Sequence, residues 1–122
     1  MIQATKENIE DILNSTHRLE GGSVTECNVD FINNVIEIAA YPEFSLVKCK
    51  FRLEGVLTFR VDDPNGCEFF GLSGYPNSLE VVFDESTVLL AIGSNESKQD
   101  LKTLKSCNFY VHAEKLFVEI LH

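Results

Sequence analysis

The sequence contains no long hydrophobic run. None of its apolar stretches approaches the roughly 20 residues that a membrane-spanning helix needs. Its first residues, MIQATKENIEDIL, also lack the basic segment followed by an apolar segment that marks a secretory signal. We therefore expect a soluble protein without a secretory signal, located in the cytoplasm and not bound to a membrane.

Positive charge is also scarce. The chain has 10 Lys and Arg residues against 19 Asp and Glu residues, which gives a formal net charge of -9. A nucleic-acid-binding surface needs a basic patch, so this balance argues against a nucleic-acid partner. The scarcity is greatest from Asp62 to Glu96, where seven acidic residues occur without any Lys or Arg.

Motifs for metals, phosphates and covalent catalysis are missing as well. The four cysteines form no C-x-x-C pair, and no glycine-rich phosphate-binding loop is present. Cys27 and Cys49 share the parity of apolar neighbours in strand-like segments, which is typical of reduced core residues. Neither His17 nor His112 lies in a recognised catalytic motif. The sequence therefore predicts a protein that is not an enzyme and that has no cofactor.

The sequence is rich in strand-like alternation. The longest example runs from Leu46 to Val61, and its first inward-facing set is Val47, Cys49, Phe51 and Leu53. The phase breaks at Gly55, after which the predicted inward set is Leu57, Phe59 and Val61. A glycine inside a strand pattern marks a bulge or bend, so we expect either one long strand bent at Gly55 or two strands that meet at a corner.

Shorter patterns surround this stretch. Thr5 to Thr16 has the apolar spacing of a short helix, with Thr5 as its N-cap. Two hairpins are predicted: Ser23–Phe31 with Val35–Tyr41, and Ser78–Phe83 with Val88–Ile92. The first hairpin turns at Asn33-Asn34. One face of its first strand carries Thr25, Cys27, Val29 and Phe31, and the other carries Glu26, Asn28 and Asp30.

The last predicted strand, Asn108–Leu121, changes parity at Glu114-Lys115, which indicates a bulge or turn there. At 122 residues the chain suits a single domain, residues 1–122. We expect an α+β, mostly β fold. It would be an antiparallel curled sheet, or a sandwich-like meander, of about seven or eight strands with one N-terminal helix.

The acidic part of the chain is the main functional candidate. Carboxylates on one rim attract a basic protein partner, and aromatic anchors among them are typical of a binding hot spot. The alternative is an ordinary solvated face. The predicted partner-binding residues are Asp62, Asp63, Glu68, Phe70, Tyr75, Glu80, Asp84 and Glu85.

Two other functions remain open. His112 and Glu114 lie two residues apart, on the same side of a predicted strand, and are the natural centre of a small-molecule-binding or enzymatic pocket lined by the sheet. The chain is also compatible with a homodimeric structural protein that pairs sheet edges, so the oligomeric state is monomer or homodimer.

The order of elements resembles that of small β-rich immunity proteins of bacterial polymorphic toxin systems. The resemblance rests on the leading helix, the first hairpin, the central FRLEGVLTFRVDD and the closing NFYVHAEKLFVEI. Its identifiable motif is F-x-x-x-G-V at Phe51, Gly55 and Val56. It implies a cytoplasmic protein that binds and neutralises a basic toxin without catalysis, and it assigns no functional residue.

Overall fold

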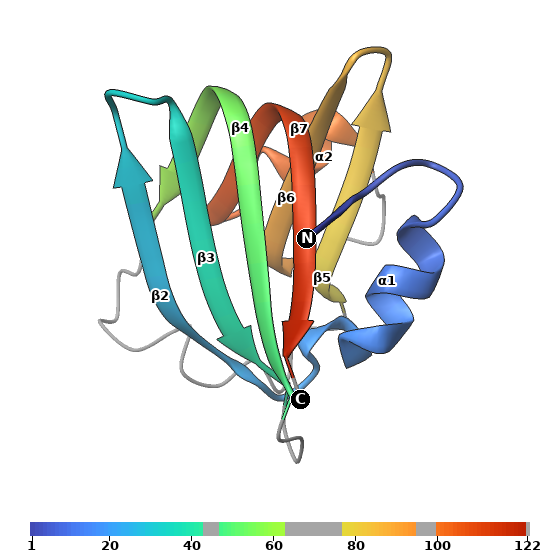
Figure 1. Ribbon diagram of the computed structural model, residues 1–122. Coiled ribbons are helices and arrows are strands. Elements are labelled where there is room, and N and C mark those ends of the chain that lie inside the picture. The colour runs from blue at the N-terminus through green and yellow to red at the C-terminus, as the bar shows by residue number, and fades with distance from the viewer. Residues whose placement is uncertain (43–46, 63–76, 95–99, 122) are drawn as a thin grey trace.

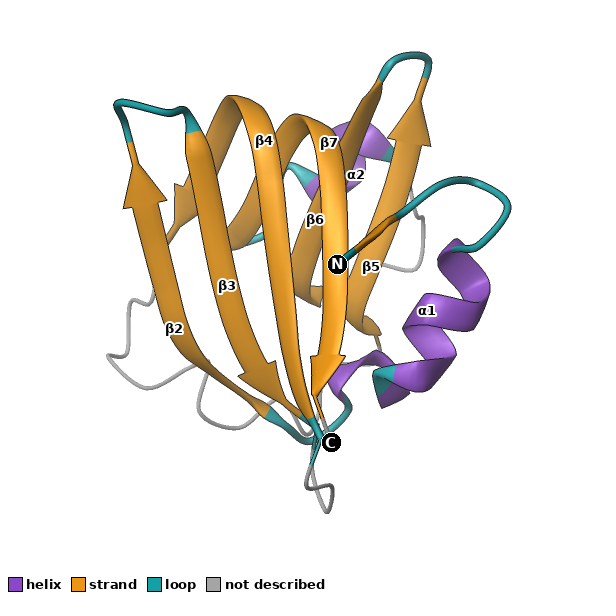
Figure 2. Cartoon of the chain, viewed as in Figure 1, coloured by secondary structure: helices purple, strands orange, loops and turns teal. Residues whose placement is uncertain are grey.

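A computed structural model describes residues 1–42, 47–62, 77–94 and 100–121. The described residues form one antiparallel sheet in the order β2-β3-β4-β7-β6-β5, with the short β1 paired to β7 (Figure 1, Figure 2). The predicted α+β, mostly β fold is confirmed. The elements are β1 (Ile2–Gln3), α1 (Ile9–Ser15), the turn η1 (His17–Leu19), β2 (Ser23–Asp30), β3 (Val35–Tyr41), β4 (Lys48–Val61), β5 (Asn77–Asp84), β6 (Thr87–Ser94), α2 (Leu101–Leu104) and β7 (Phe109–Leu121).

The sheet curls because its two longest strands, β4 and β7, bend together. Both arch over one end of the molecule (Figure 1). Their first and second halves therefore belong to different layers. β2 and β3 lie beside the first half of β4 and the second half of β7, whereas β6 pairs with the first half of β7 and β5 follows it. Of the two alternatives predicted for Leu46–Val61, the single long strand bent at Gly55 is the correct one for the described part, where β4 runs from Lys48 to Val61.

Gly55 makes this bend possible. Its φ is +67°, a left-handed conformation that costs little only for glycine. A Cβ at this position would lie 2.8 Å from Cδ of Glu114. The register then shifts by one residue between Val56 and Thr58. On β7 the parity changes at Glu114-Lys115, as the sequence indicates, and the residues on both sides of this step are buried: Phe109, Val111, Ala113, Leu116 and Val118.

The core lies between the two layers and under α1. The predicted inward residues of the first half of β4, Cys49, Phe51 and Leu53, are at most 1% exposed. Ile9 and Leu13 of α1 pack into the same cluster. A reciprocal pair of hydrogen bonds precedes α1. The Thr5 N–H donates to Asn8 Oδ1 at 2.7 Å, and the Asn8 N–H donates to Thr5 Oγ1 at 3.3 Å. The prediction of Thr5 as the N-cap is wrong, because α1 begins at Ile9 with Asn8 as its N-cap, and these two hydrogen bonds close the turn that precedes the helix.

Strand β6 is buried on both faces. Val88, Leu90 and Ile92 face the main core, while Leu89 and Ala91 pack under α2 together with Leu104 and Cys107. The continuous apolar run of this strand therefore reflects cover on both sides rather than the alternation of a half-exposed strand.

The predicted burial of three apolar residues is wrong. Leu57, Phe59 and Val61 were expected to point into the core, yet all three are exposed. Val29 and Phe31, on the apolar face predicted for β2, are exposed as well. Phe59 and Val61 lie opposite Val111 and Phe109, so they share a face with core residues. However, β3 accompanies β4 only as far as Glu54. Among the described residues, the rest of β4 is a sheet edge, where side chains on the core-facing side stay open to solvent.

Candidate protein-binding surface

The predicted acidic surface falls partly outside the described residues. This applies to Asp63, Glu68, Phe70 and Tyr75. The other four predicted residues, Asp62, Glu80, Asp84 and Glu85, belong to the described part of the chain.

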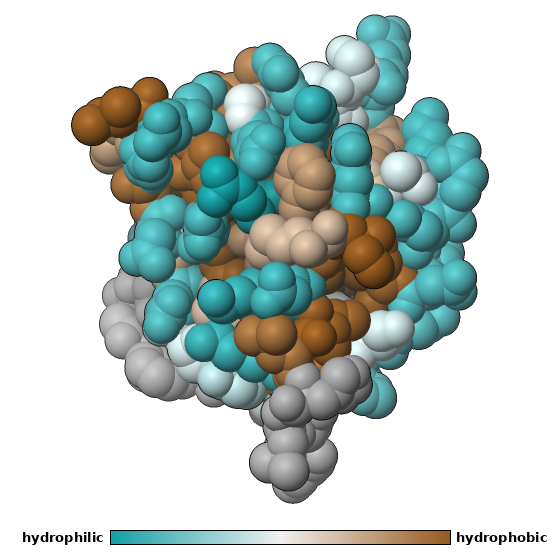
Figure 3. Space-filling model, in the orientation of Figure 1, coloured by the Kyte–Doolittle hydropathy of each residue, from teal (hydrophilic) through white to brown (hydrophobic). Residues whose placement is uncertain are grey.

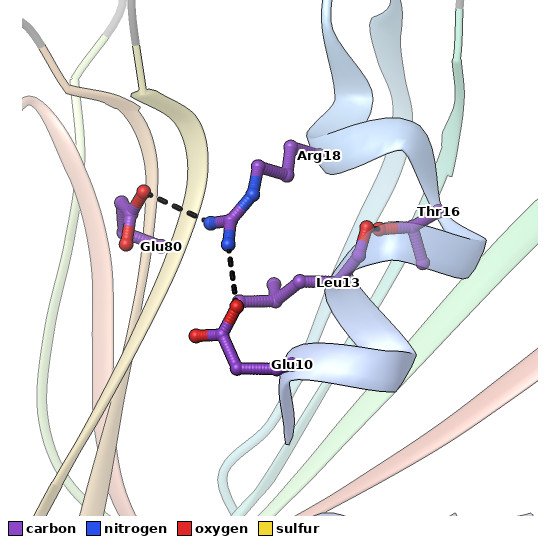
Figure 4. Close-up of polar contacts among 5 residues, drawn as sticks. All are labelled: Glu10, Leu13, Thr16, Arg18 and Glu80. Atoms are coloured by element: carbon purple, nitrogen blue, oxygen red, sulfur yellow. Dashed lines mark hydrogen bonds and ion pairs between the residues drawn. The ribbon is translucent and has the colours of Figure 1, made fainter. Parts of the chain in front are cut away.

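Glu80 is not a rim residue. Its side chain is 11% exposed and accepts a hydrogen bond from Arg18 at 3.2 Å, and Arg18 also pairs with Glu10 at 2.8 Å (Figure 4). Burial raises the pKa of Glu80, the positive charge of Arg18 opposes this, and Glu10 adds to the increase. Glu80 therefore links the segment after α1 to β5.

The segment that carries Arg18 is unusual in itself. His17, Arg18 and Leu19 all have φ between 50° and 54°, which is a left-handed turn without glycine. Such a conformation costs roughly 1–2 kcal/mol per residue. Burial of Leu19 and the ion pair of Arg18 with Glu80 are the contacts that offset this cost.

The remaining acidic residues do not form one rim. Asp62 lies beside the start of β7, where its N–H donates to the carbonyl of Asn108. Asp84 and Glu85 lie at the turn between β5 and β6, beyond the pairing of Val88 with Ala113 and thus at the other end of that layer. In addition, Asp62 is paired with Arg60 at 3.0 Å.

His112 and Glu114 do not meet in a pocket. His112 is buried on the outer face of β7, and its Nε2 lies 2.9 Å from Oγ1 of Thr87. The Thr87 hydroxyl donates to the carbonyl of Asp84, so its oxygen accepts from the His112 Nε2–H. Burial lowers the pKa of His112, Lys105 lowers it further, and Asp84 opposes both.

Glu114 instead lines an open groove of about 340 Å³ between the N-terminal segment and the β5–β6 turn. His112 does not contribute to this groove, whose charged residues are Lys6, Glu7, Glu85, Glu114 and Lys115. Within the described ranges, no three His, Cys, Asp or Glu side chains gather as a metal site. The groove is therefore lined by both carboxylates and amines.

The most distinctive surface is apolar, and we call it the apolar corner. It is made of Phe31 and Ile32 from the β2–β3 turn together with Leu57, Phe59 and Val61 from the second half of β4. Their exposed fractions are 81%, 95%, 52%, 38% and 44%. The rings of Phe31 and Phe59 lie against each other, with centroids 6.5 Å apart. Brown apolar atoms project at the position of this turn in Figure 3.

Hydrogen bonds fix the turn that presents Phe31 and Ile32. The carboxylate of Asp30 accepts from the backbone N–H of Ile32 and Asn33 and from the Asn33 side chain. Asn34 has a φ of 55°, and its side-chain amide donates to the carbonyl of Val56 at 3.0 Å. The turn is therefore attached to the bend of β4, which holds Phe31 and Ile32 in place.

Charges around the apolar corner are predominantly negative or neutralised. Arg52 pairs with both Glu37 and Glu54, and Arg60 pairs with Asp62. Asp30 is exposed, and its hydrogen bonds from Asn33 lower its pKa, so it is an anion at neutral pH. The exposed side chains of the apolar corner are therefore bordered by carboxylates.

The position of Phe31 and Ile32 along the chain indicates this exposed surface, although the two-residue periodicity of the strand suggests a buried face. Phe31 and Ile32 directly precede the turn residues Asn33-Asn34, so they lie at a hairpin tip where a sheet offers no cover.

No helix in the part of the chain that the structure describes is long and apolar enough to cross a membrane. Comparison of the sequence with protein-family models and curated proteins, and of the structure with solved structures, found no match.

Proposed function

We propose that this protein is a non-catalytic protein-binding module, of the kind that an immunity-type inhibitor represents, and that its partner is a basic protein. The observation that carries the proposal is the apolar corner. Large aromatic and aliphatic side chains that are exposed and adjacent mark interaction sites on soluble proteins. When a partner buries such side chains, they supply most of the binding energy of an interface.

Charge supports the basic nature of the partner. The net charge of -9 attracts positively charged proteins over a distance of about a Debye length and increases their association rate. The two arginines nearest the apolar corner, Arg52 and Arg60, are already paired with carboxylates. The resemblance to immunity proteins agrees with a basic partner and implies a cytoplasmic location.

Affinity capture with matched variants tests the proposal. The purified protein serves as bait for an extract of its native host, at low and at moderate salt. We expect one basic protein to be recovered in equal amount, and less of it at higher salt. The double variant F31N/I32N should no longer capture this protein, because it removes two apolar side chains of the apolar corner. Both side chains are exposed, so their replacement should leave the fold intact.

Ile2→Asn is the control, since Ile2 is 65% exposed and belongs to β1 and not to the apolar corner. Equal capture by the wild type and by F31N/I32N would contradict the proposal, as would capture of no basic protein. The homodimer alternative is tested by light scattering, because a strict monomer at high concentration excludes it.

A further inference from the structure

Some backbone N–H and C=O groups beside the apolar corner have no partner strand among the described residues. The N–H of Asp62 donates to Asn108, across the pair formed by β4 and β7. Because backbone groups of successive strand residues point to opposite sides, the N–H and C=O groups of Phe59 and Val61 point away from β7. In the described part of the chain, no strand lies on that side of β4 beyond Val56.

The other described sheet edges have features that discourage pairing. β2 contains a register shift between Val24 and Glu26 and carries exposed acidic side chains at Glu26 and Asp30. β5 packs against η1 and α1, and β1 has only two residues. Bulges, charges, covering elements and short length are the means by which proteins protect sheet edges. The second half of β4 has a register shift of its own between Val56 and Thr58, but residues 58–61 after it pair regularly with β7. The charge of Arg60 is paired with Asp62, and no described element covers the outer side of these residues.

From this edge we infer how the partner binds: an extended segment of the basic partner adds to the sheet as a strand alongside residues 58–61 of β4. The inference rests on the proposed function. Unpaired N–H and C=O groups select an extended chain, because only a strand can satisfy a row of them at this spacing. The partner strand would make about four backbone hydrogen bonds, to Phe59 and Val61.

Side chains beside the edge determine the sequence of that segment. A strand placed there has every second side chain on the face of Phe59 and Val61, next to the ring of Phe31. These positions favour apolar residues. The intervening positions favour basic residues, because Arg60 beside them is already paired with Asp62 and the chain as a whole has a net charge of -9. The occupant is therefore a strand with alternating apolar and basic residues.

A pair of variants at one position tests the strand pairing. Val61→Pro removes the outward N–H, whereas Val61→Ala removes the same side chain and keeps the N–H. The probe is a synthetic nine-residue peptide in which Val alternates with Lys. We expect Val61→Ala to bind this peptide and Val61→Pro to bind it at least about tenfold more weakly, which corresponds to the loss of a hydrogen bond from an interface.

Two control peptides define the contact. The first is N-methylated at two neighbouring central amides, so that neither of its edges can pair, and the second has Glu in place of Lys. Both should bind at least about tenfold more weakly than the probe. Amide exchange measured by NMR should be fast for Phe59 and Val61 in the free protein and should slow when the peptide is present.

Arg60→Pro checks the direction of the backbone groups. The Arg60 N–H points toward β7, so this variant should lower the melting temperature, whereas Val61→Pro should leave it nearly unchanged.

Several results would overturn the strand-addition inference. Equal peptide binding by Val61→Pro and Val61→Ala would overturn the inference and leave the proposed function intact. Unchanged binding of the N-methylated peptide would have the same meaning. Slow exchange at Phe59 and Val61 in the free protein would show that the chain itself already pairs this edge. Protection that increases with protein concentration alone would identify a second copy as the occupant. Failure of the proposed function appears separately, in the capture experiment with F31N/I32N.

Discussion

Gly55→Ala is the substitution whose effect the fold predicts most directly. The φ of +67° at Gly55 is a conformation that costs an alanine about 1–2 kcal/mol. Alanine also lowers the entropy of the unfolded chain, which returns about 0.4–1 kcal/mol. The new Cβ would meet Glu114 side-chain atoms at 2.8–2.9 Å. This side chain is exposed and can move, but its displacement adds a further cost.

We expect a net destabilisation of about 1–2 kcal/mol from these contributions. For a domain of this size, that corresponds to a decrease of about 4–8 °C in melting temperature. Thermal and urea unfolding followed by circular dichroism measure it.

Two further variants separate the causes. Gly55→Asn should cost less than Gly55→Ala, because asparagine tolerates left-handed conformations. Combining Gly55→Ala with Glu114→Ala removes the side-chain contact and leaves the backbone cost. The reasoning is refuted if Gly55→Ala changes stability by less than about 0.5 kcal/mol, or if asparagine is no better tolerated than alanine.

Three other residues give predictions of their own. Arg18→Met should destabilise the fold by about 1–3 kcal/mol at pH 7, because it leaves the buried carboxylate of Glu80 unpaired. Urea titrations at pH 7 and pH 4 measure this destabilisation, which should be smaller at pH 4, where Glu80 is protonated. The pKa of His112 is lowered in the fold, so the unfolded chain binds the extra proton first and stability should decrease as the pH falls below about 6.5. His112→Gln should remove that part of the pH dependence in the same titrations, and an unchanged slope would contradict the assignment. Cys49 is fully buried with a pKa of about 11, so iodoacetamide at pH 8 should label it only as fast as the protein opens, and rapid labelling of native protein would show that it is not in the core.

Local sequence patterns predict much of the sheet, because alternation reports burial wherever a strand has neighbours on both sides. Cys49, Phe51 and Leu53 follow that rule. The parity change at Glu114-Lys115 is also visible in the sequence, since core residues must stay on the inside after the strand bends.

The same patterns fail where a neighbouring strand ends. Phe59 and Val61 alternate correctly and lie on the core-facing side, but no periodicity reveals that β3 stops at the level of Glu54. The sequence also gives no sign of the left-handed turn at residues 17–19, because it depends on the distant partner Glu80. The acidic stretch looks continuous along the chain, yet the fold sends Asp62 and Asp84 to opposite ends of one layer.

Among the described strands, β7 comes last along the chain but occupies the middle of the sheet. It pairs with β4 along both halves, and also with β6 and β1. Each of its pairings with β4 closes a loop of roughly 50–70 residues. During synthesis, β1 to β6 therefore leave the ribosome before the strand that connects the two layers, and the core is completed in a late, non-local step. Refolding in milliseconds to seconds, and not in microseconds, would be the kinetic consequence of this strand order.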